Sequence, residues 1–241
     1  MHMMGGMRLF DRIHKIYAWT PAGKRLLDVG CDRGFVTQGF AQKAKEVYGI
    51  DNNKEAIAYG KKHHTGVTLI HAPGERIPFK NEYFDIVVMG DVLEHVEDEK
   101  KTLNEVYRVM KKDGTLLISV PHKGLFRWID TFNMKFYFPR LYRWWKGKKY
   151  DLSVYTIQPW HRHYSLHDLK KLFGNKFEVV KVHRGGLLVY PLCWLCGDIT
   201  KDLFGNKIPV VGKILTWLGH IDYTIPFGPF GYSILVRAKR R

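Results

Sequence analysis

Residues 25–120 alternate short, β-branched apolar runs with segments of helical periodicity, and this alternation limits the choice of fold more than any other feature. The expected strands are 25–30, 46–51, 67–71, 84–90 and 115–120. The expected helices between them are 35–45, 53–63 and 98–110. Strands and helices in alternation are typical of parallel βαβ units, and strands that are apolar throughout are expected when helices cover both faces of the sheet. The sequence therefore predicts an α/β fold.

The regular pattern breaks after Pro121 and returns in two places. A helix is expected at 165–173 with Ser165 as its N-cap, and strands are expected at 177–183 and 232–238. The stretches 122–164 and 185–231 do not fit the alternation, and we found no repeat or low-complexity linker in them. We therefore expect a single domain over 1–241, with a core at about 25–121 and two insertions.

The net charge of +16 is concentrated in the second half of the chain. Lys and Arg number 14 against 15 Asp and Glu in residues 25–120, but 21 against 7 in residues 121–241. This excess favours an anionic partner such as nucleic acid, a membrane surface or a phosphorylated substrate, with a solvated basic face as the plain alternative. Because the chain has no apolar run of about 20 residues, no signal-like start and only 3 Cys, we expect a cytoplasmic protein.

The segment Leu27–Gly34 lies at the first expected junction between strand and helix. Ligands of open α/β sheets bind at the carboxyl ends of strands, and glycines there allow close approach of the backbone. A dinucleotide site requires G-x-G-x-x-G, but Asp32 and Phe35 occupy its third and sixth positions, which argues against a dehydrogenase. Asp51 ends the next strand, where a carboxylate can accept hydrogen bonds from ribose hydroxyls.

Three segments carry a family resemblance: LDVGCDRG at 27–34, VYGIDNN at 47–53, and ERIPFKNEYFDIVVMGDVLEHVEDEKKTLNEVYRVMKKDGTLLISVP at 75–121. Together they resemble the class I S-adenosylmethionine-dependent methyltransferases, in particular the branch of ubiquinone and menaquinone biosynthesis. The resemblance implies a Rossmann-like fold with a mostly parallel seven-stranded sheet, helices on both faces and two inserted segments. It also implies S-adenosyl-L-methionine as cofactor, S-adenosyl-L-homocysteine as product, and no metal.

By this resemblance, a set of residues at the strand ends is expected to bind the cofactor. They are Asp28, Gly30, Cys31, Gly34, Asp51, Asn52, Gly74, Glu75 and Asp91. Asp51 would bind ribose, and Asp91 would meet the methionine amino group. Asp32 replaces the family's usual glycine, although Asp tolerates positive φ better than most residues. Pro73 stands where an Asp usually holds adenine, so we expect Gly74 and Glu75 to recognise that ring.

Methyl transfer from a sulfonium depends mainly on alignment and exclusion of water. A base helps when the acceptor is a hydroxyl or an acidic carbon, and His161 and His163 are the candidates. Structural hydrogen bonding by these histidines, or an anionic acceptor bound by Arg162, remains an alternative. The C-x-x-C pair Cys193 and Cys196 has no second pair, so buried thiols are favoured over zinc.

The first insertion interleaves aromatic and basic residues, including Trp128, Trp144 and Trp145, a pattern that suits either nucleic acid or a membrane headgroup zone. The second has apolar runs at 187–196 and 208–218 that are too short to span a bilayer. These stretches could form a lid, lie on a membrane, or both. We expect a small-molecule or lipid-like acceptor, with an anionic membrane surface as partner and a peripheral position at the inner face of the membrane. An RNA or protein methyltransferase, or a protein that binds the cofactor without catalysis, are the alternatives.

Overall fold

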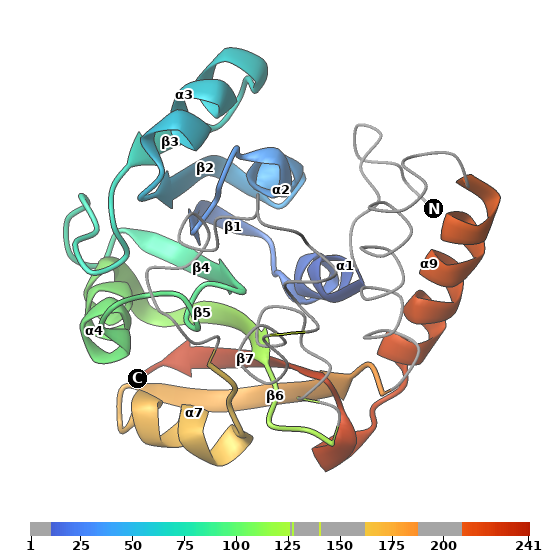
Figure 1. The fold of residues 1–241 in the computed structure, drawn as a ribbon. Helices are drawn as coiled ribbons and strands as arrows, with labels where there is room; N and C mark the ends of the chain where they lie inside the picture. Colours follow the sequence, from blue (N-terminus) through green and yellow to red (C-terminus); the bar gives the residue numbers. More distant parts are fainter. Residues whose placement is uncertain (1–10, 126, 128–139, 141–161, 188–208) are drawn as a thin grey trace. The chain divides into compact units, whose positions relative to one another are not determined.

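The computed structural model describes residues 11–125, 127, 140, 162–187 and 209–241. Seven strands form one sheet in the order β3-β2-β1-β4-β5-β7-β6 (Figure 1). Their bounds are β1 Gly23–Val29, β2 Ala44–Asp51, β3 Thr68–His71, β4 Phe84–Gly90, β5 Met110–Pro121, β6 Phe177–Gly185 and β7 Ser233–Arg240. The strands β1 to β5 pair in parallel, as expected for βαβ units.

The last strand, β7, runs against both of its neighbours. Arg240 at the end of β7 donates to the carbonyl of Met110, which begins β5, so these two strands are antiparallel. The amide of Arg241 donates to the carbonyl of Lys176 at 2.9 Å, just before β6 begins, so β6 is antiparallel to β7 as well. The predicted mostly parallel, seven-stranded sheet is confirmed.

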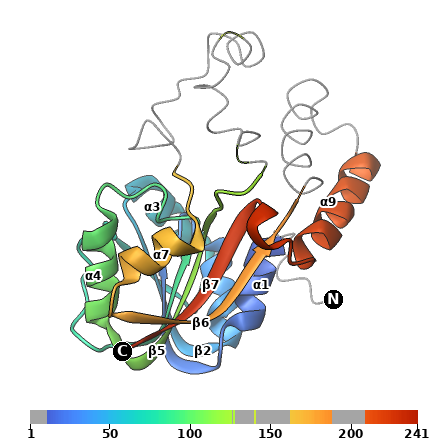
Figure 2. The ribbon, with the colours of Figure 1, turned by 90° about the horizontal axis from the view of Figure 1, so that it is seen from below.

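Helices cover both faces of the sheet: α4 and α7 lie on one side and α1 on the other (Figure 2). The helices are α1 Asp11–Trp19, α2 Phe35–Gly39, α3 Lys54–His63, α4 Glu99–Val109, α7 Leu166–Phe173 and α9 Pro209–Thr224, with short 3-10 turns at Phe40–Gln42 and Gly228–Phe230. Asn53 and Asp98 cap α3 and α4 by accepting hydrogen bonds from amides of the first turn. Within the described ranges, none of the helices combines the length and apolar character needed to span a membrane.

Three element bounds differ clearly from those expected, the first being that β5 begins at Met110 instead of Thr115. The helix expected at 35–45 ends at Gly39, and β2 begins at Ala44 instead of Glu46. Ala44 of β2 pairs with Gly23 of β1. Because Ala44 and Lys45 belong to this strand, the preceding helix cannot extend to 45. The sequence analysis did not anticipate α1, whose Ile16 is buried in the core cluster with Leu26 and Phe40.

Contacts divide the chain into two compact units. The first comprises residues 1–120, 166–182 and 235–241, and the second comprises residues 121–165 and 183–234. The second unit follows the insertions expected at 122–164 and 185–231 within a few residues. The organisation of residues 1–241 as a single domain stays a prediction.

Candidate cofactor site

Three neighbouring parallel strands end together at one edge of the sheet. In the strand order, β1 lies between β2 and β4, and Val29 pairs with both Ile50 and Met89. The next residues along the three strands are Gly30, Asp51 and Gly90. They therefore lie together at the carboxyl edge of the sheet (Figure 1). This is where open α/β sheets bind ligands.

The turn after β1, residues 30–34, contains three residues with positive φ and is here called the glycine turn. Gly30, Asp32 and Gly34 all take positive φ, at 74°, 47° and 79°. The amides of Gly30 and Cys31 both donate to the carbonyl of Ile50, at 2.8 and 3.0 Å, which ties the turn to β2. A side chain at Gly30 would overlap Val92, so the turn requires glycine for space as well as for conformation. The positive φ expected of Asp32 is confirmed.

Asp51 is held in place by backbone amides on both sides. Its Oδ2 accepts from the amide of Asp32 at 2.8 Å, and its Oδ1 accepts from the amide of Asn53 at 2.8 Å. Each carboxylate oxygen retains accepting capacity for a ligand hydroxyl. Asn52 is exposed beside it, and its carbonyl lies 3.0 Å from Nε2 of His71.

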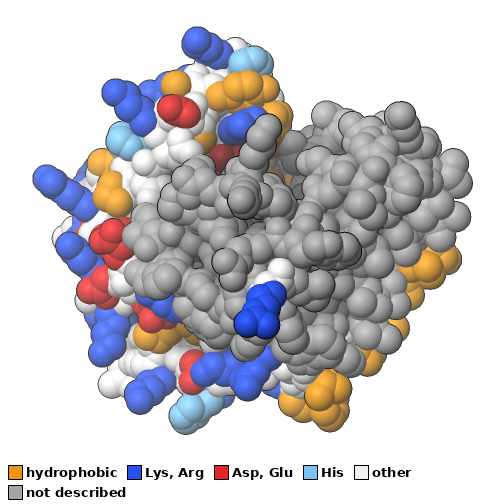
Figure 3. Space-filling view, viewed as in Figure 1, with side chains coloured by type: hydrophobic (Ala, Val, Ile, Leu, Met, Phe, Trp, Pro, Cys, Tyr) orange, Lys and Arg blue, Asp and Glu red, His pale blue; other side chains and the backbone are white. Residues whose placement is uncertain are grey.

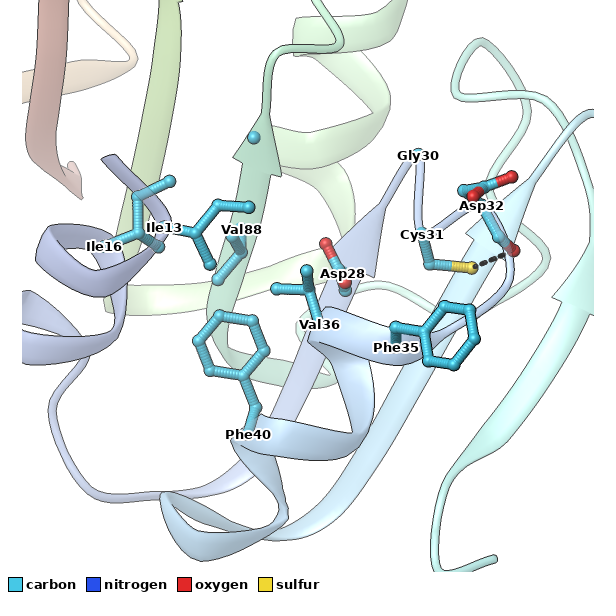
Figure 4. A pocket seen from close by; sticks show the side chains of 11 residues that line it. Ile13, Ile16, Asp28, Gly30, Cys31, Asp32, Phe35, Val36, Phe40 and Val88 are labelled. Atoms are coloured by element: carbon cyan, nitrogen blue, oxygen red, sulfur yellow. Dashed lines mark hydrogen bonds between the residues drawn. The ribbon is translucent and has the colours of Figure 1, made fainter. Parts of the chain in front are cut away.

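A pocket of about 220 Å³ opens at this edge (Figure 4). Figure 4 shows the carboxylate of Asp28 among the lining side chains, with Ile13 and Ile16 of α1 on one side and Cys31 and Asp32 on the other. The remaining lining residues come from the turn after β1, from α2, from the 3-10 turn that follows it and from β4: Gly30, Phe35, Val36, Phe40, Val88 and Gly90. The pocket is thus apolar around a single buried carboxyl group, as is typical of sites that exclude water from a small ligand.

Asp28 is 5% exposed, and its Oδ2 accepts a hydrogen bond of 2.6 Å from the buried hydroxyl of Thr37. Burial raises the pKa of Asp28 to about 7; the Thr37 bond opposes this rise and the negative charge of Asp51 adds to it. Asp28 is therefore close to half ionised at neutral pH. Burial also raises the pKa of Cys31, which keeps its thiol neutral in the pocket wall.

The binding of a cationic ligand to this pocket should strengthen with pH. S-adenosylmethionine carries one more positive charge than its product, so it should favour ionised Asp28, and its affinity should rise up to about tenfold between pH 6 and 8. The same raised pKa stabilises the fold below pH 3.8, and this contribution is lost as pH rises through about 7. Calorimetric titrations at pH 6 and 8 measure the effect. Asp28→Asn should remove it, and an equal slope in that variant would contradict the assignment.

Asp91 directly follows β4 and has φ 56°. Its side chain accepts one hydrogen bond and forms one ion pair. Its amide donates to the carbonyl of Ser119 at 3.0 Å, and the Ser119 hydroxyl donates to its Oδ1 at 3.1 Å. Nε of Arg12, in α1, lies 2.5 Å from its Oδ2. The strand end thus holds a carboxylate and a guanidinium side by side.

Gly74 and Glu75 lie in the loop after β3. A side chain at Gly74 would crowd Thr102 and Val29. Oε1 of Glu75 accepts from the amide of Glu97 at 3.0 Å, so this carboxylate is engaged by the loop before α4. The structure does not bring either residue into the pocket lining, and their role toward adenine stays a prediction.

The structure does not test the two candidate bases. His161 lies outside the described residues, as do Trp144, Trp145, Cys193 and Cys196. His163 belongs to the second unit, where it is half-buried next to Tyr164. Their catalytic role stays a prediction. Among the residues that the structure describes, no group of three or more His, Cys, Asp or Glu could hold a metal ion.

Three residues of the site were missed from the sequence: Arg12, Thr37 and Ser119. Thr37 and Ser119 are fully buried and each contacts a carboxylate that was predicted, namely Asp28 and Asp91. The apolar spacing of Ile13, Ile16 and Tyr17 was the available signal for α1 and hence for Arg12.

Comparisons with known proteins agree with this geometry. Residues 27–118 match the model of a methyltransferase domain family. A ubiquinone biosynthesis O-methyltransferase of Pseudomonas entomophila is 34% identical over 111 residues, which cover 43% of this chain and 47% of that protein. The chain spans about half the length of the curated relatives that it matches.

Solved structures share the fold at low sequence identity. A SAM-dependent methyltransferase of Thermotoga maritima superposes with a TM-score of 0.60 at 17% identity, over 96% of this chain and 88% of that one. The cyclase SpnF superposes with a TM-score of 0.59 at 16% identity, over 95% and 80%. The fold agrees with these structures, and the sequence match over residues 27–118 and the named relatives support a class I S-adenosylmethionine-dependent methyltransferase family.

Proposed function

We propose that this protein transfers a methyl group from S-adenosylmethionine to a small-molecule or lipid-like acceptor. The observation that carries the proposal is the convergence of the glycine turn and Asp51, linked by the bond from the Asp32 amide to the Asp51 carboxylate. A carboxylate fixed at the end of the second strand is suited to accept hydrogen bonds from ribose hydroxyls. When bound, the cofactor supplies an activated methyl group on a sulfonium.

The residues present fit the methionine end of that cofactor. An amino acid end carries one ammonium and one carboxylate, and Asp91 and Arg12 offer the two opposite charges at the end of β4. Asp28 adds negative charge inside the pocket when ionised. The apolar lining from α1 and α2 would exclude water, which strengthens these charge interactions.

The acceptor class rests on different support. The Pseudomonas relative is named for O-methylation in ubiquinone biosynthesis, and the stretches outside the matched region are rich in apolar and aromatic residues. Both favour a lipid-like acceptor over RNA, whose recognition relies on polar readout and phosphate contacts. For a hydroxyl acceptor, His161 or His163 would serve as base, and a position at the inner face of a membrane would give access to the acceptor.

The test is a transfer assay with methyl-labelled S-adenosylmethionine and fractionated cell extract. We expect label in the lipid or small-metabolite fraction, and at subsaturating cofactor at least about tenfold less label when Asp51→Ala replaces the unaltered chain. Label in RNA or protein would leave methyl transfer intact and overturn the acceptor class. A shared fold does not fix the reaction, as the cyclase SpnF illustrates by its name. Absence of label in every fraction, from protein that binds the cofactor, would therefore favour the non-catalytic alternative.

A further inference from the structure

Exposed apolar side chains are concentrated at α9 and the residues after it. Nine large hydrophobic side chains are exposed in the described parts of the chain, and five of them lie between 217 and 230. These five, here called the α9 face, are Trp217, Leu218, Ile221, Ile225 and Phe230. Trp217 is 62% exposed and Phe230 is 54% exposed. Figure 3 shows hydrophobic side chains along the edge where Figure 1 draws α9.

The exposed residues of α9 share one side of the helix. At 100° per residue, Trp217, Leu218 and Ile221 fall within an arc of about 100°. Asp222 and Tyr223 are buried on the other side. Over residues 217–224, the part of α9 whose side chains the structure describes, the exposed apolar side chains therefore lie on one face of the helix.

The buried side of α9 is fixed by hydrogen bonds to the end of β6 and the residues after it. Oδ2 of Asp222 accepts from the amide of Leu187 at 2.9 Å, and the carbonyl of Tyr223 lies 2.7 Å from Nε2 of His183. The amide of Phe227 donates to the carbonyl of Arg184 at 2.9 Å. Because these contacts hold the other side of the helix, the α9 face cannot turn inward without breaking them.

The net charge of the second unit favours an anionic membrane over a second copy of the chain as the partner of the α9 face. The second unit carries 13 Lys and Arg against 5 Asp and Glu, a net charge of +8. Asp222 is the sole carboxylate of α9, and it is buried and bound to the Leu187 amide. Two copies of this unit would repel each other, whereas an anionic bilayer attracts basic residues and accommodates Trp and aliphatic side chains in its headgroup zone.

We propose that the α9 face docks on an anionic membrane surface. The helix lies in the plane of the surface, with Trp217 and Ile221 inserted among the headgroups. A length of about 24 Å for 16 residues suits this orientation. The docking depends on apolar side chains and net charge alone, so it holds whether or not the chain transfers a methyl group.

Flotation of the full chain with vesicles tests the proposal. The vesicles contain equal parts of phosphatidylcholine and phosphatidylglycerol, with phosphatidylcholine alone as comparison, each at low and high salt. We expect binding to the anionic vesicles that salt weakens without abolishing, because insertion of apolar side chains resists screening. The double variant Trp217→Ser, Ile221→Ser should lower partitioning at least about tenfold.

The matched control is the double variant Tyr59→Ser, Val180→Ser, which removes two exposed hydrophobic side chains that belong to the first unit. It should partition as the unaltered chain does, and both variants should keep the unfolding midpoint because all four positions are exposed. Equal partitioning of the two variants would overturn the proposal, as would absence of vesicle binding by the unaltered chain. A dimer that Trp217→Ser, Ile221→Ser dissociates would assign the face to a second copy instead. Binding to single-stranded RNA that this variant abolishes would assign it to nucleic acid.

Discussion

Asp51→Ala should weaken the binding of S-adenosylmethionine by roughly 1.5 to 3 kcal/mol for each charged hydrogen bond to ribose that is lost. This corresponds to at least about a tenfold rise in Kd for one bond, and more if both hydroxyls are bound. The variant also leaves the amides of Asp32 and Asn53 without their carboxylate partner, which should loosen the glycine turn. Calorimetric titration gives the Kd, and thermal unfolding shows whether the fold is retained.

Glu55→Ala is the matched control for this experiment. Glu55 is an exposed carboxylate in the first turn of α3, so its removal changes the net charge by the same amount near the same strand end. We expect its Kd to stay within about twofold of the unaltered chain, because an exposed charge contributes little. An unchanged Kd in a folded Asp51→Ala variant would remove Asp51 from the site.

Gly30→Ala should destabilise the protein by about 2–5 kcal/mol. A left-handed backbone costs an L-residue about 1–2 kcal/mol, and overpacking costs about 1–3 kcal/mol more. Both terms apply, because Gly30 has φ 74° and its added Cβ would overlap Val92. The free energy of unfolding in denaturant measures the loss, and cofactor binding should fall with it because the turn lines the pocket.

Gly66→Ala separates the cost of the left-handed backbone from the cost of overpacking. Gly66 has φ 79°, close to that of Gly30, but nothing lies within 4 Å of an added Cβ. Its loss should therefore be limited to the backbone term of about 1–2 kcal/mol, without effect on the cofactor. If Gly30→Ala costs no more than Gly66→Ala, the close packing of the turn against Val92 does not constrain the site.

The strand ends could be predicted because they depend on local signals. Apolar runs bounded by Gly30, Asp51 and Gly90 fixed where β1, β2 and β4 end, and β4 has the predicted bounds 84–90. Parallel pairing then brings those ends together without further information. The positive φ of Asp32 could be expected from the family resemblance, because glycine usually stands at this position and Asp tolerates positive φ better than most residues.

The side-chain partners could not be predicted, because they come from distant parts of the chain. Arg12 is 79 residues from Asp91 in sequence, and Ser119 is 28 residues away. The pKa of Asp28 depends on burial under α1 and α2, which no local pattern encodes. The sequence showed an apolar run at 208–218, but only the structure shows that α9 continues to Thr224 and that Trp217 and Ile221 are exposed on it.

Calorimetric titration of the unaltered chain with S-adenosylmethionine tests the central claim most directly. The site built from the glycine turn, Asp28, Asp51 and Asp91 predicts one saturable binding event per chain. Binding should also raise the unfolding midpoint as ligand exceeds Kd. Absence of both heat and stabilisation at high micromolar cofactor, in a folded protein, would contradict the assignment of this pocket to S-adenosylmethionine.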